Sequence, residues 1–443
     1  MSWPFIAFCA FLALIALAGG SSRADSFSQI IVRLGSISFV AALILLRPGF
    51  SARGSRPALL LLAVMALLIG AHLVPLPPAT WTGLPGRGLY ASIDATPPWR
   101  PLNLAPDRGW NALLALIPPL SAVLGLCCLS REERERLIVP VLLVVGASAI
   151  LGVAQLSGGA PAVFQRYATN APMAAAGLFA NRNHGALLLA LGLPLLAYWA
   201  LKGRRSDQGG GQRGAVGFGA GALLVLAIPS TGSRTGLLVG GLALLMVIAL
   251  SARTVVQALA KLSRRTRMLA LTGGAAAIVS LLVVALTFDQ AVSVQRFVLR
   301  DIADDPRGRT LPTLRMMAEQ FFPAGVGFGS FEYTYRRFQP FELLGFTYLN
   351  QAHNDLLQIV IEAGAPGAGL LIAAVAWWGW RTVVLWRVSA SVPYVRLGRI
   401  ASGLLLLVTI ASLVDYPVRT PLFMVLLAIF ASWLTLYDPR LRR

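Results

Sequence analysis

Apolar runs of about 18 residues or more recur along the whole chain, and polar loops separate them. A helix needs roughly 20 residues to cross the hydrocarbon of a bilayer. Repeated runs of this length therefore predict an all-α, polytopic membrane protein folded as one helical bundle. The composition agrees, because 56% of the residues are hydrophobic and 13% are charged, whereas about 25% are charged in a soluble protein.

Twelve apolar runs of 14 to 21 residues can be distinguished, so we expect about 12 transmembrane helices. The first run has the length of a signal peptide, but no basic residue precedes it and no clean cleavage site follows. We therefore expect it to be an uncleaved first helix. The runs cover residues 3–20, 29–46, 58–76, 110–129, 138–156, 184–201, 215–229, 237–250, 268–288, 368–386, 400–414 and 422–436.

The loops between these runs alternate in charge, which predicts the orientation of the chain. Loops rich in Lys and Arg stay in the cytoplasm, so the side that carries the basic loops and both termini is expected to be cytoplasmic. The basic segments are 47–57, 130–137, 202–214, 252–267, 387–399 and the C-terminal tail. The loops that then face outward are 77–109, 157–182, 230–236, 289–367 and 415–421.

The longest polar interruption, 289–367, separates the ninth and tenth runs. We interpret it as the working part of a membrane enzyme. The formal net charge of +20 does not indicate a nucleic-acid partner, because the charges are scattered and form no basic domain. The loop holds a cluster of arginines, namely Arg296, Arg300, Arg307, Arg309, Arg315, Arg336 and Arg337.

Three further arginines, Arg182, Arg234 and Arg419, stand at helix ends or in tight turns on the same outer face. A half-buried guanidinium is costly in lipid and usually marks function. The alternative is that each side chain snorkels to the lipid headgroups. Together with the loop, the three are suited to hold a polyanion such as a lipid-linked pyrophosphate through charge-assisted hydrogen bonds.

His353 precedes an amphipathic stretch that Gly364 and Pro366 are expected to stop, and Asn354 or Asp355 is expected to cap it. A histidine with a near-neutral pKa at such a place can act as a general base on a hydroxyl. The alternative is a histidine that only makes a structural hydrogen bond.

Other motifs carry weaker signals. His184 stands beside Arg182, and its alternative role is again a purely structural hydrogen bond. His72 is expected to be buried in an apolar run. The glycines of 325–329 lack the context of a nucleotide-binding loop and more simply predict a tight turn. No His/Glu metal motif is present, so we expect no metal and no cofactor.

Four patches, taken in order, resemble the O-antigen ligase family, whose core domain is shared with the O-antigen polymerases. The resemblance covers about 175–370, which suggests N-terminal helices at 1–174, a core at 175–370 and C-terminal helices at 371–443. The patches are Phe179-Ala180-Asn181-Arg182-Asn183-His184; Ser230-Thr231-Gly232-Ser233-Arg234-Thr235-Gly236; Arg309 with residues 323–331; and Ala352-His353-Asn354-Asp355-Leu356-Leu357-Gln358 with residues 362–367.

The resemblance implies a GT-C-like glycosyltransferase of the bacterial inner membrane, with its large loop in the periplasm. The donor would be a glycan on undecaprenyl pyrophosphate, and the acceptor would be lipid A-core or a growing glycan. Arg234 and Arg309 would bind the pyrophosphate and His353 would activate the acceptor hydroxyl. We add Arg182 and Arg419 to the pyrophosphate site because they stand at helix ends on the same predicted face. The supporting residues would be Asn183, Ser233 and Asn354.

Two other functions remain open. A polymerase would use the same chemistry on a different acceptor, which the sequence does not distinguish. A secondary transporter also suits twelve spans, but transporters usually place polar sites at mid-membrane within repeated halves. This sequence shows no repeat, and its ionisable residues gather at one face.

Overall fold

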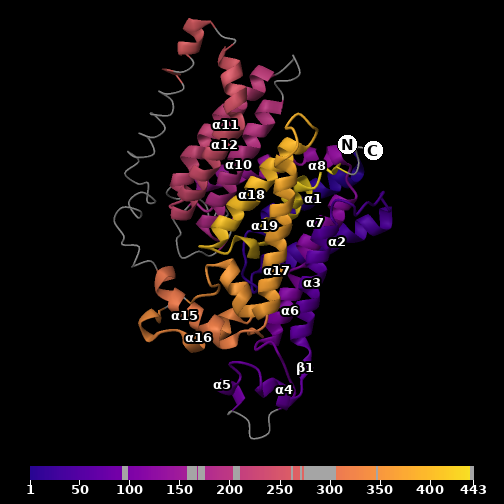
Figure 1. Ribbon diagram of the computed structural model, residues 1–443, viewed down its shortest axis with the longest axis vertical. Coiled ribbons are helices and arrows are strands. Elements are labelled where there is room, and N and C mark those ends of the chain that lie inside the picture. Colours follow the sequence, from indigo (N-terminus) through magenta and orange to yellow (C-terminus); the bar gives the residue numbers. More distant parts are fainter. Residues whose placement is uncertain are drawn as a thin grey trace. The chain divides into compact units, whose positions relative to one another are not determined.

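The computed structural model describes residues 1–91, 98–156, 167, 175–202, 210–260, 263–269, 272–273, 306–345 and 348–439. The described chain is helical apart from two short strands (Figure 1). It divides into two compact units. The first contains residues 1–134, 302–405 and 412–443, and the second contains residues 135–301 and 406–411.

Four apolar helices pack together in the first unit: α1 (Trp3–Ala18), α2 (Phe27–Leu46), α7 (Ile117–Cys127) and α19 (Pro421–Leu434). α7 lies against both α2 and α19, and α1 contacts the same two helices. Phe11 and Phe39 stack where α1 meets α2, with ring centroids 4.7 Å apart. The aromatic and aliphatic side chains of these helices form a close-packed core. The few polar side chains buried there include Ser121, whose hydroxyl donates to the Ser36 carbonyl at 3.2 Å.

A second group of elements surrounds α3 (Arg56–Leu73), which packs on α6 (Pro106–Leu114) and on α17 (Asp355–Trp386). Between α3 and α6 the chain is rich in proline and forms only short elements. They are β1 (Pro75–Leu76), α4 (Pro78–Thr82), α5 (Gly88–Ala91) and β2 (Arg100–Pro101), in which β1 and β2 pair antiparallel. The short charged helix α8 (Arg131–Arg136) begins beyond α7.

The described part of the long polar interruption is helical. It contains α15 (Pro306–Phe321), α16 (Phe331–Phe338) and the 3₁₀ turn η4 (Phe341–Leu343). α15 and α16, orange in Figure 1, lie beside the first half of α17. They enclose a small core of their own that includes Met317, Phe321 and Tyr335. The described part of the polar segment is therefore folded and packed, because its apolar side chains contact one another in this core.

Arg87 fixes this layer to the proline-rich segment. Its side chain is fully buried, and Nη2 donates to the carbonyls of Leu102 (2.6 Å) and Gly325 (3.1 Å). The guanidinium lies 5.6 Å from the Trp81 ring and 5.7 Å from the Phe321 ring. Burial lowers the pKa of Arg87 to about 10, so the residue stays protonated at neutral pH and its charge is balanced by carbonyl dipoles and aromatic faces.

α17 is interrupted where the sequence predicted a stop. Its 32 residues include Gly364 at φ 56° and ψ −140°, which is not a helical conformation, so α17 consists of two helical segments joined at a kink. The predicted stop at Gly364 is confirmed, and the second segment corresponds to the predicted apolar run 368–386. Proline removes one helical hydrogen bond and crowds the preceding turn, and the apolar sequence beyond it lets the helix resume.

The kink exchanges helical hydrogen bonds for bonds to another segment. Pro366 has no N–H to offer the carbonyl of Glu362, and the N–H of Gly327 donates to that carbonyl at 2.8 Å. The N–H of Val326 donates to the Ile361 carbonyl at 3.0 Å. Buried carbonyls need such partners, so the kink and the 325–329 segment stabilise each other.

The 325–329 segment is a tight turn, as the sequence predicted. Gly325, Gly327 and Gly329 have φ values of 77°, 96° and 79°, a region that side chains with a Cβ rarely adopt. A Cβ at Gly327 would lie 2.4 Å from the Cα of Asn103. The glycines are therefore needed both for the backbone angles and for the close contact.

The second unit is formed by α9 (Ile138–Leu156), α10 (Arg182–Lys202), α11 (Gly210–Ser230) and α12 (Arg234–Ala260), in the magenta region of Figure 1. α10 packs against each of the other three. Its residues from Asn183 to Leu196 are all buried. A helix that is apolar all round is expected at the centre of a bundle, and α10 has that place in this unit.

The helices coincide with eleven of the twelve predicted runs, and α18 (Val395–Ser412) belongs to this set. The ninth run, 268–288, lies almost wholly outside the described residues. Within the described residues, nine helices are long and apolar enough to cross a membrane, and α1 and α19 are shorter apolar helices. The chain is an all-α, multi-pass membrane protein. The number of twelve spans, their orientation and the division at 174 and 370 stay predictions.

Candidate functional site

His353 stands in a tight turn before α17, with a φ of 51°. Its Nδ1 lies 3.3 Å from Oδ1 of Asp415, and its side chain is 21% exposed while Asp415 is 1% exposed. The Tyr416 ring packs edge-on against the imidazole at 4.8 Å. The contact lacks hydrogen-bond geometry, since His353 Nδ1 has no hydrogen-bond partner among the described residues. A buried carboxylate at this distance would favour the tautomer with its proton on Nδ1 and leave Nε2 as the basic nitrogen.

Side chains of α17 hold this turn in place. Asn354 is the N-cap residue, and its Oδ1 accepts the N–H of Leu357 at 2.9 Å. Gln358 Oε1 accepts the N–H of Ala352 at 2.8 Å, and Gln358 Nε2 donates to Gln351 Oε1 at 2.6 Å. The predicted cap is confirmed for Asn354. These bonds fix the backbone on both sides of the histidine.

Arg419 bridges two turns of the same helix. It lies in the 3₁₀ turn η5 (Pro417–Arg419), its Nε donates to Asp355 Oδ1 at 3.2 Å, and its Nη2 donates to Glu362 Oε2 at 3.2 Å. Both carboxylates are 1% exposed. Removing one partner of a buried charge network typically costs about 3–5 kcal/mol. The guanidinium thus clamps the start of α17, including the residue two places after His353.

In the second unit, two predicted arginines stand at the starts of two helices. Arg182 is the first residue of α10 and Arg234 the first of α12. The hydroxyl of Ser233 donates to Asn183 Oδ1 at 2.7 Å, which ties the two helix starts together. Ser233 Oγ also accepts the N–H of Gly236 at 2.8 Å. Helix N-termini carry partial positive charge and unpaired N–H groups, so this end of the unit suits an anion.

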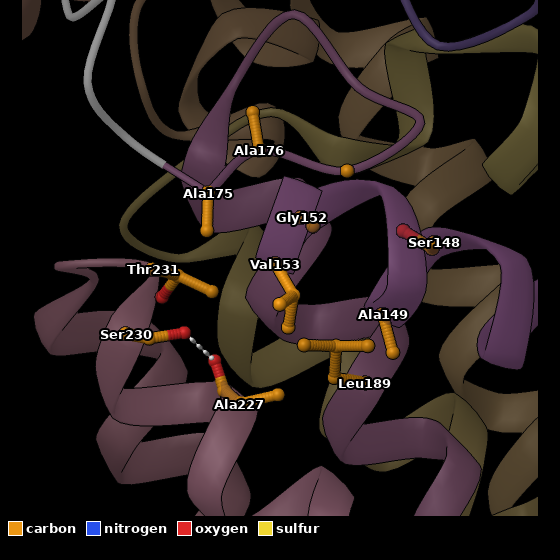
Figure 2. Close-up of a pocket in the computed structure, with 12 residues that line it drawn as sticks. Ser148, Ala149, Gly152, Val153, Ala175, Ala176, Leu189, Ala227, Ser230 and Thr231 are labelled. Atoms are coloured by element: carbon orange, nitrogen blue, oxygen red, sulfur yellow. Dashed lines mark hydrogen bonds between the residues drawn. The ribbon is translucent and has the colours of Figure 1, made fainter. Parts of the chain in front are cut away.

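A small cavity lies beside these helix starts (Figure 2). Ser148, Ser230 and Thr231 contribute to its wall, and the hydroxyl of Ser230 donates to the Ala227 carbonyl at 2.8 Å. Its volume of about 10 Å³ is close to the minimum for a single water molecule. The cavity is too small for a sugar or a phosphate group, so it is no substrate site.

The remaining predicted residues lie as follows. Arg309 is exposed on the first turn of α15, and His184 is buried with its ring edge-on to Phe179 at 5.9 Å. Arg296 and Arg300 lie outside the described residues, as does the side chain of Arg307. His72 is buried, as predicted, and faces Phe328. In the described ranges, no group of three or more His, Cys, Asp or Glu side chains has the arrangement of a metal site.

Sequence reasoning missed Asp415, Asp355 and Glu362 as partners of the histidine and arginine. Asp415 lies in a loop that was predicted to face outward. The presence of a carboxylate in that loop was the signal in the sequence that could have pointed to a partner for His353. Asp355 was considered only as a helix cap, whereas the structure buries it against Arg419.

Residues 219–372 match the protein-family model described as O-Antigen ligase. The match covers about a third of the chain and contains α12, α15, α16 and the first half of α17. It includes Arg234, Arg309 and His353. No curated protein matches the chain.

Proposed function

We propose that the chain, whose residues 219–372 match the O-Antigen ligase family model, transfers a glycan from undecaprenyl pyrophosphate to an acceptor hydroxyl. The match supports a lipid-linked glycan-processing enzyme. The donor, the acceptor and the reaction are our proposal, as are the bacterial inner membrane, the periplasm-facing active site and the cytoplasmic termini. The observation that carries the proposal is the His353 imidazole beside the buried carboxylate of Asp415.

The unit with His353 would activate the acceptor. The acceptor oxygen attacks the anomeric carbon of the donor sugar, and the bond from that carbon to the pyrophosphate oxygen breaks with its electron pair. His353 Nε2 takes the hydroxyl proton, a step typically worth about 10²–10⁴-fold. Asp415, 3.3 Å from Nδ1, stabilises the imidazolium that results. Direct displacement inverts the anomeric configuration.

The pyrophosphate would be bound by arginines. Arg182 and Arg234 at the helix starts of the second unit, together with Arg309 of α15, would offset the negative charge that grows on the leaving group. Asn183 and Ser233 would hold the two helix starts. No bond change in this reaction calls for a nucleotide or a metal ion.

Arg419 was assigned to the same group from its position, and that assignment stays a prediction. Its two carboxylate partners at 3.2 Å support another role, in which it positions the turn that bears His353. Asn354, the N-cap residue of α17, would help to position the turn that bears His353.

The direct test is transfer in detergent or proteoliposomes. Purified protein is mixed with a lipid-pyrophosphate glycan and candidate acceptors, without added metal. We expect His353→Ala to insert normally and to lose about 10²-fold or more of kcat, and Asp415→Asn to lose about tenfold or more because the tautomer is no longer fixed. Glu342→Gln, an exposed change on η4, is the control and should be neutral.

Two results would reject the proposal. One is undiminished transfer by His353→Ala. The other is a product that retains the anomeric configuration of the donor, because a single displacement cannot give it.

A further inference from the structure

A pocket of about 260 Å³ lies in the first unit, next to the turn that bears His353. Its floor is apolar and comes from α3 and α6, with Met65, Ile69 and Ala112 among the contributors. Gln351 and Asp355, which lie two places before and after His353 in the chain, both belong to the wall. The pocket therefore extends along the same stretch of backbone that positions the histidine.

The rim of the pocket is polar and reaches the surface. It includes Arg23 and Asp25, whose side chains are 48% and 62% exposed, and Tyr348, which is 46% exposed. Arg336 stacks over the Tyr348 ring at 4.8 Å and holds the ring in place. A ligand can therefore enter past an aromatic face and fixed charged groups.

The charges that line the pocket compensate one another. Arg23 pairs with Asp25 at 3.0 Å, and Arg419 pairs with two buried carboxylates. The lining contains three arginines, Arg23, Arg108 and Arg419, and four carboxylates, Asp25, Glu332, Asp355 and Glu362. A pyrophosphate needs an excess of cationic donors, which this pocket does not provide. It therefore does not suit the leaving group of the donor.

The same lining suits an uncharged, hydroxyl-rich ligand. Carboxylates accept hydrogen bonds, guanidinium groups donate them, and amides such as Gln351 and Asn350 do both, as a sugar with several hydroxyls requires. The apolar floor and the Tyr348 ring can cover the C–H face of a sugar ring. The volume lies just below the range of about 300–1,000 Å³ that is usual for drug-sized ligands, so it corresponds to a single sugar residue.

We propose that this pocket is the acceptor subsite of the enzyme and binds an uncharged sugar residue that presents the attacking hydroxyl near His353. The inference rests on the proposed function and adds the chemical class of the acceptor. It predicts that the enzyme discriminates against an acceptor whose terminal sugar is phosphorylated.

The first experiment compares two variants of the lining with matched variants outside it. Ala112→Phe fills the floor, and Leu114→Phe, two places along α6 on an exposed residue outside the lining, is its control. Tyr348→Ala removes the rim ring without overpacking. Phe341→Ala is its control, because Phe341 is an aromatic residue that is 83% exposed and does not line the pocket.

We expect the acceptor KM to rise by about tenfold, the change that corresponds to about 1.4 kcal/mol, in both lining variants and in neither control. The donor KM should stay within about twofold, a change of less than about 0.5 kcal/mol. An unchanged acceptor KM in Tyr348→Ala overturns the inference even if Ala112→Phe does not fold. A rise in the donor KM in place of the acceptor KM overturns it as well.

The second experiment tests the charge argument with an uncharged acceptor and its phosphorylated counterpart. The wild-type protein should use the uncharged form at least about tenfold better, by kcat/KM. Asp25→Asn leaves Arg23 without its partner and should reduce that preference, most at low salt where exposed charges are least screened. Glu342→Gln should not change it. Equal use of both acceptors by the wild type contradicts the inference.

The two proposals fail in different ways. If the wild type transfers nothing from a lipid-pyrophosphate donor to any acceptor, the proposed function is wrong and the acceptor assignment falls with it. If the wild type transfers normally and the lining variants keep their acceptor KM, only the assignment of this pocket is wrong.

Discussion

At the scale of single residues, three buried carboxylates of the first unit gather around the turn that bears His353. Asp355 and Glu362 bind Arg419, and Asp415 stands beside His353. Buried carboxylates are costly unless they are paired, so their concentration around one turn needs a reason. Fixing an imidazole in one orientation is such a reason, because general-base catalysis depends on geometry before it depends on pKa.

Variants of Arg419 distinguish a positioning role from pyrophosphate binding. Lysine keeps the charge but cannot bridge two carboxylates as a guanidinium fork does. If Arg419 positions the turn, Arg419→Lys should lower kcat about tenfold or more with an unchanged donor KM, the sign of an interaction realised only in the transition state. It should also shift the pH profile of kcat, which a loss of folded protein would not do.

Two comparisons complete this test. Glu362→Gln removes one end of the clamp and should reproduce the kinetics of Arg419→Lys, whereas Glu319→Gln, on an exposed residue of α15, should be neutral. A raised donor KM in Arg419→Lys, together with tighter donor binding in Glu362→Gln, would instead support the pyrophosphate assignment.

At the scale of elements, the kink of α17 is the feature that joins the helical segment after His353 to the 325–329 segment. Local sequence predicted the distortion from Gly364 and Pro366, since both residues break regular helices. It also predicted a new helix at 368–386, the second segment of α17. It did not predict that Val326 and Gly327 supply the missing donors. Those donors lie more than thirty residues away, and only the folded chain brings them to the kink.

Gly364→Ala should therefore be destabilising. A Cβ there would lie 1.9 Å from the Pro323 carbonyl oxygen, at a φ of 56°, and such a backbone angle alone costs a non-glycine residue about 1–3 kcal/mol. Gly369→Ala, on the same helix with no atom within 4 Å of the added Cβ, should be neutral or stabilising by up to about 1 kcal/mol.

Thermal unfolding and transfer activity of both variants in the same detergent give the comparison. The account of the kink is wrong if Gly364→Ala melts and reacts like the wild type, or if Gly369→Ala is the more damaged of the two.

At the scale of the whole molecule, hydropathy was enough to predict the helices, whereas the candidate site depends on contacts between residues far apart in the sequence. Apolar runs predicted eleven helices because a membrane span is a local property of sequence. The partners of His353 and Arg419 could not be predicted in this way. Asp415 is about sixty residues from His353, and Glu362 is 57 residues from Arg419. A single sequence contains no sign that such distant residues meet.

The orientation of the chain can be tested with two single cysteines in a background without Cys9, Cys127 and Cys128. In intact spheroplasts, a membrane-impermeant maleimide should label Glu342→Cys, on the loop predicted to face outward, and should not label Ser391→Cys, in a basic loop. The reason is the retention of Lys- and Arg-rich loops in the cytoplasm. Permeabilised cells should show both labels, and the reverse pattern in intact cells would contradict the predicted topology.

The length of α17 has a consequence for how the enzyme can evolve. Its 32 residues, in two segments joined at Gly364, exceed the roughly 20 that cross a bilayer, so about one dozen residues before the span form a stalk that, under the proposed function, would hold the His353 imidazole clear of the acyl chains. Each residue of a helix adds about 1.5 Å and turns the chain by about a quarter to a third of a circle. Adding or losing one residue in this stalk would swing the imidazole away from its carboxylate neighbour, so length changes are tolerable only outside it.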